Sequence, residues 1–590
     1  MKLINRWYTF FKRAWFLCFI LLLSTALFST SFPQVSTAYA QGITNSQQNN
    51  QVWLPLVQSN ESQKSSSPSP APAPVPASAS EWTQDAHDAQ HTGYTQEVPQ
   101  TPWTLAWTWN GPDSNGGTGG HFYDAPRSAR TVTGGSYVYV PAGKEGLYAL
   151  KKSDGSEGWH RTETSFNAAP AYHAASGYLL AGGEDGTLYK INSETGQITG
   201  TYQAGSPLSR SIILAGNYAY AVSENGDLHK VEIDSMKAAW VYSAGSDAAT
   251  PPAYSASTGL IVYATADLNV HAVKDADGSR QWKVKPTSHS AEYPYTFDGY
   301  WPVIAEQNGL VFLRLNLGMD ALWSGPLTGD WGGGVYPETN SDIRALLKQD
   351  DGSLENLFAL RLSDGSKAFT PAVGFGGVEA LLNDKPVLES GPMPVIRPLS
   401  EGGEVAYLQF RNGQGSPHDG RWDSHMGEMV LDNDTISSLS AGDMRFVDFP
   451  GGYANITDEQ TPLTMAGDVL FQAHWGASEA IRITDRSSSL GLNHDQPINA
   501  EALPTVIRRM QECSSFDPST HWTTCGLTLF DDGRYWPGPG FWVYWNVLDP
   551  PTPDRSAYSE GILPRYTYVS DGLIIVEGNG GDIFVLRHSG

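Results

Sequence analysis

Residues 137–159 read YVYVPAGKEGLYALKKSDGSEGW, and this phrase indicates how the chain folds. The runs 137–140 and 147–150 are rich in aromatic and β-branched residues, which is typical of short strands. Glycine recurs between and after these runs, as in Asp154-Gly155, where it suits the tight turns that join such strands. The phrase therefore predicts antiparallel strands joined by short turns, with Trp159 on the last of them.

The same phrase recurs along the chain. Its second run has counterparts whose first residues lie 41, 40 and 42 positions apart, beginning at Leu147, Leu188, Leu228 and Val270. Repetition of short strands at this period is typical of propeller blades. A turn residue is followed four positions later by tryptophan in three of these units, whereas Gly200 takes the tryptophan's place in the second unit. The three pairs are Gly155 and Trp159, Met236 and Trp240, and Gly278 and Trp282.

Four further units complete a predicted ring of eight blades. The fifth contains 303–305, 310–313 and 357–360; the sixth 395, 405–408 and 429–431; the seventh 469–471 and 480–483; and the eighth 566–568, 573–576 and 583–586. The eighth unit has only three strands, of which 583–586 is the last. We expect residues 103–109 to supply the fourth strand, because closure between the two ends removes exposed sheet edges.

The phrase at 137–159 resembles the repeat of pyrroloquinoline quinone (PQQ)-type β-propellers. The stretch Trp82-Thr-Gln-Asp-Ala-His-Asp-Ala-Gln-His-Thr-Gly93 resembles the N-terminal phrase common in that family. The resemblance covers about 81–285 and reappears at 340–370 and 561–590. It implies an all-β fold, a single eight-bladed propeller over 81–590. The family contains both enzymes and scaffolds, so the resemblance does not by itself imply an activity.

The resemblance also gives an expectation about cofactors. Quinoprotein dehydrogenases of the family bind PQQ beside a disulfide between adjacent cysteines, and they use calcium and an Asp base. In this chain Cys513 and Cys525 are not adjacent, and no Glu, Asn and Asp set aligns with the calcium ligands. We therefore expect no PQQ, no calcium, no metal and no catalytic residues. The non-enzymatic branch resembles an outer-membrane assembly factor whose propeller binds proteins. An enzyme at the propeller mouth, a quinoprotein-like oxidoreductase or a hydrolase or lyase, is the alternative.

The first 40 residues have the order of a secretory signal peptide. Basic residues at 2, 6, 12 and 13 precede the apolar run 14–23, and Ala38-Tyr39-Ala40 predicts cleavage between Ala40 and Gln41. An uncleaved membrane anchor is the alternative, although the apolar run is shorter than the roughly 20 residues of a spanning helix. Residues 41–80, rich in Ser, Pro and Ala, are expected to form a disordered linker.

Charge and cysteine content narrow the function classes. The net charge is −25, and removal of the four basic residues in the signal makes it about −29, which disfavours nucleic acid and anionic lipid. We expect a monomer, secreted or at the cell surface, with no transmembrane segment after cleavage. In such a compartment Cys513 and Cys525 are expected to form a disulfide, and two free buried thiols are the alternative.

Three insertions are the candidate binding regions, at about 315–354, 411–424 and 487–557. The first two lie between second and third strands and are expected on one face of the propeller, where loops on a rigid scaffold would bind a protein or carbohydrate ligand. In the third, Tyr535, Trp536, Trp542 and Trp545 are possible ligand-binding aromatics. Alternatively, residues 541–547 form the outer strand of the seventh blade, with these aromatics packed inward.

Two weaker motifs have structural interpretations that we favour. His87 and His91 could bind a metal as a pair only on a helix, and we expect them to hydrogen-bond within the N-terminal phrase. Asp275-Ala-Asp277-Gly278 resembles part of a calcium loop but lacks the later Glu, and it occupies the turn position of the repeat. We expect it to form a turn.

Overall fold

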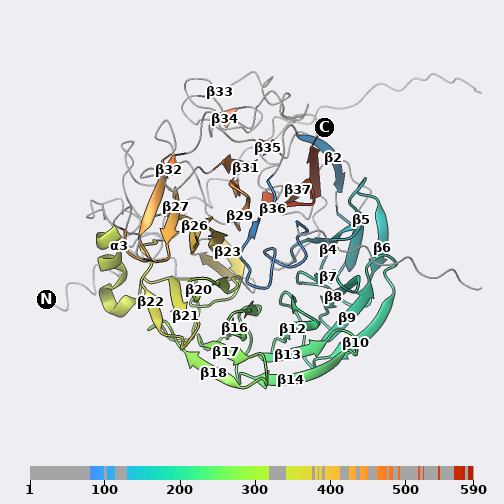
Figure 1. Cartoon of the computed structure of the whole chain (residues 1–590), viewed down its shortest axis with the longest axis horizontal. Helices are drawn as coiled ribbons and strands as arrows, with labels where there is room; N and C mark the ends of the chain where they lie inside the picture. The colour runs from blue at the N-terminus through green and yellow to red at the C-terminus, as the bar shows by residue number, and fades with distance from the viewer. Residues whose placement is uncertain are drawn as a thin grey trace, which may run out of the picture. The chain divides into compact units, whose positions relative to one another are not determined.

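Antiparallel sheets stand side by side around a ring in the computed structural model (Figure 1). In the residues described, eight sheets have four or five strands each, which confirms the all-β, eight-bladed prediction. All of these residues belong to one unit, Ala71–Gly590. The structure describes residues 80–98, 103–109, 111–112, 129–317, 340–374, 379–382, 385–388, 392–400, 402–411, 424–432, 439–448, 462–474, 477–482, 490–491, 516–517, 522–523, 542–544, 564–578 and 583–588.

Blades 1 to 5 are each built from four consecutive strands. The alternation of β-rich runs and glycine turns produces the up-and-down order in each sheet, from the innermost strand outward. The strands are β3 (Val132–Gly134), β4 (Tyr137–Pro141), β5 (Leu147–Lys151), β6 (Glu157–Arg161), β7 (Ala171–His173), β8 (Tyr178–Gly182), β9 (Thr187–Asn192), β10 (Ile198–Gln203), β11 (Ile213–Ala215), β12 (Tyr218–Val222), β13 (Asp227–Glu232), β14 (Lys237–Ser243), β15 (Ala253–Ser255), β16 (Leu260–Ala264), β17 (Val270–Lys274), β18 (Arg280–Val284), β19 (Val303–Ala305), β20 (Leu310–Arg314), β21 (Leu357–Arg361) and β22 (Lys367–Phe369).

Blades 6 to 8 follow the same order with additions from elsewhere in the chain. Blade 6 gains a short parallel strand, and blade 7 pairs with strands from far before and far after its own hairpins. Their strands are β25 (Val395–Pro398), β26 (Glu404–Arg411), β27 (Ser424–Val430), β28 (Met444–Asp448) and β32 (Leu490–Gly491); β1 (Tyr94–Thr95), β29 (Thr464–Ala466), β30 (Val469–His474), β31 (Ala477–Arg482) and β35 (Trp542–Tyr544); and β36 (Pro564–Ser570), β37 (Leu573–Gly578), β38 (Ile583–His588) and β2 (Trp103–Trp109).

The remaining elements are short. Helix α3 (Asn340–Leu347) and the 3₁₀ turn η1 (Gln349–Gly352) lie between β20 and β21. Two small hairpins are formed by β23 (Glu379–Leu382) with β24 (Lys385–Leu388) and by β33 (Phe516–Asp517) with β34 (Trp522–Thr523). Within the described part of the chain, no helix is long and apolar enough to cross a membrane.

The ring closes as the sequence predicts. Strand β2 pairs antiparallel with β38, so the start of the domain completes blade 8. Side chains then join blade 8 to blade 1, because the Thr131 backbone N–H donates to Glu577 Oε1 at 2.7 Å and the Thr133 and Ser570 hydroxyls lie 2.6 Å apart. Neighbouring innermost strands contact one another from β3 to β36. Both ends of the propeller are therefore held in one cooperative sheet.

Tryptophans of the outer strands join four of the blades to the blade that follows. The indole Nε1 of four tryptophans donates to a backbone carbonyl of the following blade at 2.7–2.9 Å: Trp107 to Lys152, Trp159 to Ser193, Trp240 to Asp275 and Trp282 to Leu362. Each ring covers a turn glycine with φ of 70–73°, where a Cβ would come within 2.5–2.8 Å of the ring: Gly155, Gly196, Gly278 and Gly365. Glycine is therefore needed at this turn for its left-handed backbone and for the close approach of the indole.

The exception in blade 2 has a packing explanation. Blade 2 carries Gly200 where its neighbours carry tryptophan, and blade 3 carries Met236 where its neighbours carry the turn glycine. Met236 adopts a φ of 51° and is buried. A Cβ on Gly200 would lie 2.8 Å from the Met236 Cγ. The methionine side chain thus fills the space that an indole fills elsewhere.

An N-terminal segment runs through the middle of the ring (Figure 1). We call residues 81–97 the axial segment. Its carbonyls accept hydrogen bonds at 2.7–2.9 Å from the innermost strands of six blades: Trp82 from Thr133, Thr83 from Tyr172, Ala89 from Tyr254, Gln90 from Ile304, Thr92 from Ile396 and Gly93 from Met465. Gln84 Oε1 accepts from the Leu214 N–H in blade 3, and the Trp82 N–H donates to Ser570 Oγ in blade 8. The axial segment therefore contacts all eight blades.

Candidate functional site

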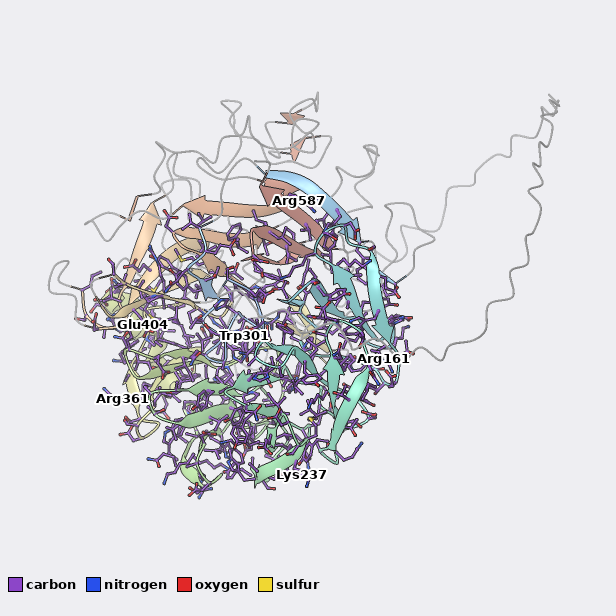
Figure 2. The ribbon with its side chains drawn as sticks, turned by 45° about the vertical axis from the view of Figure 1, so that its right-hand side comes forward. Arg161, Lys237, Trp301, Arg361, Glu404 and Arg587 are labelled. Atoms are coloured by element: carbon purple, nitrogen blue, oxygen red, sulfur yellow. The ribbon has the colours of Figure 1, made fainter. Side chains whose placement is uncertain are left out.

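A buried polar cluster fixes the axial segment at the centre of the ring. Asp85 Oδ1 forms an ion pair with Arg130 Nη1 at 2.6 Å, and its other carboxylate oxygen accepts from Ser211 Oγ at 2.6 Å. The Arg130 guanidinium lies 3.9 Å from the centroid of the Trp301 ring. Figure 2 shows Trp301 in the middle of the ring and Lys237 and Arg361 at its rim. An ion pair and a hydrogen bond thus hold Asp85, and a cation–π contact holds its partner Arg130.

His91 and Tyr566 complete this axial cluster, and burial sets their ionisation. Burial lowers the pKa of His91, against the opposing influence of Asp85, so its imidazole is neutral. His91 Nδ1 donates to the Pro302 carbonyl at 3.0 Å. Burial likewise raises the pKa of Tyr566 well above its usual value, so the phenol is neutral as well. The expected hydrogen bonding within the N-terminal phrase holds for His87, whose Nδ1 lies 3.2 Å from Asp88 Oδ2, whereas the His91 side chain bonds outside the phrase.

The axial cluster offers no surface to a substrate. Asp85, His91, Arg130, Ser211, Trp301 and Tyr566 are each 7% exposed or less. One face of Trp301, against which a flat cofactor could stack, is covered by Arg130. In the described residues, no three His, Cys, Asp or Glu side chains are grouped so that they could hold a metal ion. The axial cluster therefore does not fit PQQ with calcium.

The insertion between β20 and β21 builds a rigid wall on one face of the propeller. Ile343 and Leu347 of α3 are buried against blades 5 and 6. Asn340 Nδ2 donates to the Met444 carbonyl at 3.0 Å, and Asn340 Oδ1 accepts from the Met444 N–H at 2.9 Å. Arg344 forms an ion pair with Asp443 beside this contact. The helix therefore bridges blade 5 to the outer strand of blade 6.

The far end of this insertion is held by the connection from blade 4 to blade 5. His289 Nε2 donates to the Ser353 carbonyl at 2.8 Å, and its ring stacks on Tyr295 with centroids 3.7 Å apart. Between these two anchors lies an open cavity of about 470 Å³. We call it the insertion cavity. It is lined by Lys348, Asp351 and Glu355 from the insertion, by Lys367 and Phe369 from β22, and by the neighbouring Thr370, Pro286, Ser288 and Gly352.

Charges in the insertion cavity are paired and ordered. Glu355 is only 5% exposed and forms an ion pair with Lys367. Its second carboxylate oxygen accepts from Thr370 Oγ1 at 3.1 Å. Lys348 and Asp351 add one charge of each sign, so the formal charges of the cavity cancel. The cavity therefore presents several hydrogen-bond donors and acceptors but carries no net formal charge.

The structure places the predicted site residues unevenly. Cys513, Cys525, Tyr535, Trp536 and Trp545 lie outside the described residues, as do Ala40, Gln41 and the linker before residue 80. Trp542 begins β35, which pairs with β31, so residues 542–544 form an outer strand of blade 7, and the inward packing of the aromatics stays a prediction. Of the predicted insertion 315–354, residues 315–317 and 340–354 are described, and most of 411–424 and 487–557 is not.

The other weak motif is a turn, as expected. Asp277 accepts a hydrogen bond from the Ser279 N–H at 2.9 Å, and Gly278 has φ of 72°. Asp275 holds Lys230 of blade 3 in an ion pair. Sequence reasoning missed the axial path of 81–97 and the insertion cavity. The only signal for the first was the density of short polar residues in Trp82–Gly93, and for the second the charged residues flanking Leu357–Leu360.

Comparisons with known proteins give one family match and several structural matches. A family model described as outer membrane protein assembly factor BamB matches residues 97–196 and 147–295. No curated protein matches the sequence. Among solved structures, BamB from Moraxella catarrhalis is 9% identical with a TM-score of 0.42, covering 78% of this chain and 96% of its own.

Two other solved structures are similar at the same level. The quinohemoprotein alcohol dehydrogenase ADHIIG from Pseudomonas putida HK5 is 11% identical with a TM-score of 0.41, covering 68% of this chain and 71% of its own. The computationally designed protein Ika8 is 9% identical with a TM-score of 0.40, covering 82% of this chain and 99% of its own. The strand pairing of this chain is that of an eight-bladed β-propeller, and its residues 97–295 match the model of the PQQ-like repeat family.

Proposed function

We propose that this protein is an exported, non-enzymatic propeller that binds a protein or a glycan through the face carrying its insertions. One observation carries the proposal. Residues 81–97 occupy the centre of the ring and are bonded to all eight blades. A ligand would therefore bind on the outer surface of the propeller. The anchored α3–η1 insertion and its cavity then offer a concave surface for such a ligand.

The family supports this proposal and adds a cell compartment. The matching family model is named for an outer membrane assembly factor, and the first 40 residues carry a signal-like sequence. We infer that the chain is exported, works outside the cytoplasm without a bound cofactor, and acts by presenting a rigid binding face. The net charge of −25 makes nucleic acid an unsuitable partner.

The test compares two faces of the same molecule. Lys348→Glu changes the insertion face, and Lys274→Glu makes the same charge change at an exposed position beside the opposite hairpin of blade 4. Secreted protein, with its N-terminus sequenced, is applied to arrays of surface proteins and glycans. We expect an N-terminus at Gln41 and binding that Lys348→Glu weakens at least tenfold and Lys274→Glu leaves unchanged.

Two results would overturn the proposal. One is binding that depends on the opposite face or is absent from both arrays. The other is enzymatic: a quinone absorbance, a rise in melting temperature and dye-linked oxidation on addition of PQQ and calcium. Retention of the chain inside the cytoplasm would overturn the export part alone.

A further inference from the structure

The insertion cavity has the size and wall of a small-molecule site. Its volume of about 470 Å³ falls within the roughly 300–1,000 Å³ typical of ligand pockets. Both ends of its wall are anchored, by Asn340 on Met444 and by His289 on Ser353. A wall fixed before binding lowers the entropy cost of capturing a small ligand.

The charges of the insertion cavity favour a neutral ligand. Lys348 and Lys367 are matched by Asp351 and Glu355. An anionic group placed beside the lysines would also approach two carboxylates, and a cation beside the carboxylates would approach two ammonium groups. The acidic surface of the whole chain disfavours an anion further.

The polar groups suit a ligand with many hydroxyls. Lys367 donates to Glu355 and has two further N–H donors, and its side chain is 39% exposed. Thr370 donates to Glu355 and keeps its oxygen lone pairs for a ligand. Ser288 adds a hydroxyl that can donate or accept. Because a sugar hydroxyl also does both, vicinal hydroxyls can bond the ammonium and the carboxylate together.

An apolar surface lies next to these groups. Phe369 and Pro286 line the same cavity, and the Phe369 ring is half-buried against the backbone at Gly442. Such a surface can cover the C–H face of a sugar ring. A large protein interface is less well supported, because exposed large apolar side chains in the described residues are three separated ones, Val98, Val241 and Tyr293.

We propose that the insertion cavity binds a neutral saccharide of one or two rings, held by Lys367, Glu355 and Thr370 and packed on Phe369. This assignment rests on the proposed binding function and names its ligand class. The proposal predicts that the saccharide contacts only residues of the insertion cavity and that the axial cluster takes no part in binding.

The experiment is saturation-transfer NMR on the full mature chain. The probes are maltose, cellobiose, xylobiose and mannobiose as neutral disaccharides, and a digalacturonic acid as an acidic one. Lys367→Met removes a hydrogen-bond donor from the cavity, and Phe369→Ala removes its apolar surface. Lys274→Met, on the opposite face, is the matched control for Lys367→Met. Melting temperature and far-UV circular dichroism check that each variant is folded.

We expect millimolar or tighter binding of at least one neutral disaccharide, weakened tenfold or more by Lys367→Met and unchanged by Lys274→Met. Glu355→Gln should raise the affinity for the digalacturonic acid, because one negative charge is removed. Preference of the natural chain for the acidic probe, or no binding of any neutral probe, overturns the saccharide assignment. Binding of an array protein that Lys348→Glu abolishes would then leave the broader proposed function standing.

Discussion

Asp85 and Arg130 show how much of this molecule depends on single buried contacts. The carboxylate and the guanidinium are 1% and 5% exposed and lie 2.6 Å apart, and each has a second partner, Ser211 for Asp85 and Trp301 for Arg130. A pair this deeply buried stabilises the native state only while both charges are present. The pair also links the axial segment to the residues just before β3.

Removal of one partner should therefore be costly. Asp85→Ala leaves the Arg130 charge buried, and we expect the free energy of unfolding to fall by about 3–5 kcal/mol. Urea denaturation followed by tryptophan fluorescence measures it. The control Lys144→Ala breaks an exposed pair with Glu145 and should cost less than about 0.5 kcal/mol. An Asp85→Ala effect as small as the control's would contradict the assigned role.

For single residues, the sequence predicted the structural role more successfully than it predicted the residue that each side chain contacts. The turn at Asp277 and the hydrogen bonding of His87 were predictable, because turn chemistry and spacing are local. The partners of Asp85 and Glu355 were not, since Arg130 is 45 residues from Asp85 and Lys367 belongs to a strand beyond the insertion. Long-range pairing depends on how the blades are placed around the ring, and a single sequence does not encode it in any short motif.

Among the elements, the outer-strand tryptophans and turn glycines form one recurring joint between blades. Gly155 lies beneath Trp107, Gly196 beneath Trp159 and Gly278 beneath Trp240. The period and the Gly-to-Trp spacing were visible in the sequence. The reason for the exception in blade 2 was not visible, because Gly200 and Met236 belong to different blades and meet only in the folded ring.

The departure of Gly200 and Met236 from the tryptophan and glycine of the other joints can be reversed by mutation. Gly200→Trp alone should lose about 1–3 kcal/mol of stability, because the indole would overlap Met236. Met236→Gly alone leaves a void. The double variant restores the joint found in the other blades, so a double-mutant cycle by chemical denaturation should give a coupling energy of about 1–3 kcal/mol in favour of the pair. Additivity within about 0.5 kcal/mol would show that the two positions do not compensate.

Histidines on the third strands make these joints sensitive to pH. The Tyr242 hydroxyl is hydrogen-bonded to His271 Nδ1 at 3.0 Å, and His271 Nε2 lies 3.3 Å from Thr265 Oγ1. Burial lowers the pKa of His271 from 6.5 to about 4, helped by the Lys283 and Arg280 charges and opposed by Asp267. Burial also lowers the pKa of His229, which pairs with Tyr202 in the same way one blade earlier.

The sign of the resulting pH dependence is fixed. Above pH 6.5 His271 is neutral in both the folded and unfolded chains; between 6.5 and about 4 only the unfolded chain binds a proton, so stability falls as pH falls. The shift corresponds to a loss of about 3 kcal/mol by pH 4. Urea denaturation from pH 8 to pH 4 measures it. We expect His271→Gln to flatten the slope below pH 6.5, and an unchanged slope in that variant would contradict the assignment.

The whole molecule is a ring fastened twice by its N-terminal region. Strand β2 completes blade 8, which the sequence predicted from the missing fourth strand. The axial segment fastens the ring from inside, which the sequence did not predict. Its path requires left-handed backbone at Ala86, His87 and His91, a conformation that costs roughly 1–2 kcal/mol per residue and is compensated by contacts with eight separate blades. The density of short polar residues in Trp82–Gly93 was the only local signal, and it does not specify such a path.

Hydrogen exchange of the native chain, followed by mass spectrometry, tests the axial segment most directly. Six carbonyls between residues 82 and 93 accept hydrogen bonds from N–H groups of the innermost strands, and the N–H groups of Trp82, His87, Gln90, His91, Thr92 and Gly93 are themselves bonded. Peptides covering this segment and β3, β15, β19 and β25 should therefore exchange only by global unfolding, as slowly as peptides of β16. In Asp85→Ala, protection of the segment and of all these inner strands should fall together. Exchange of residues 82–93 within seconds in the natural chain, with the inner strands still protected, would contradict a ring closed around its own N-terminal segment.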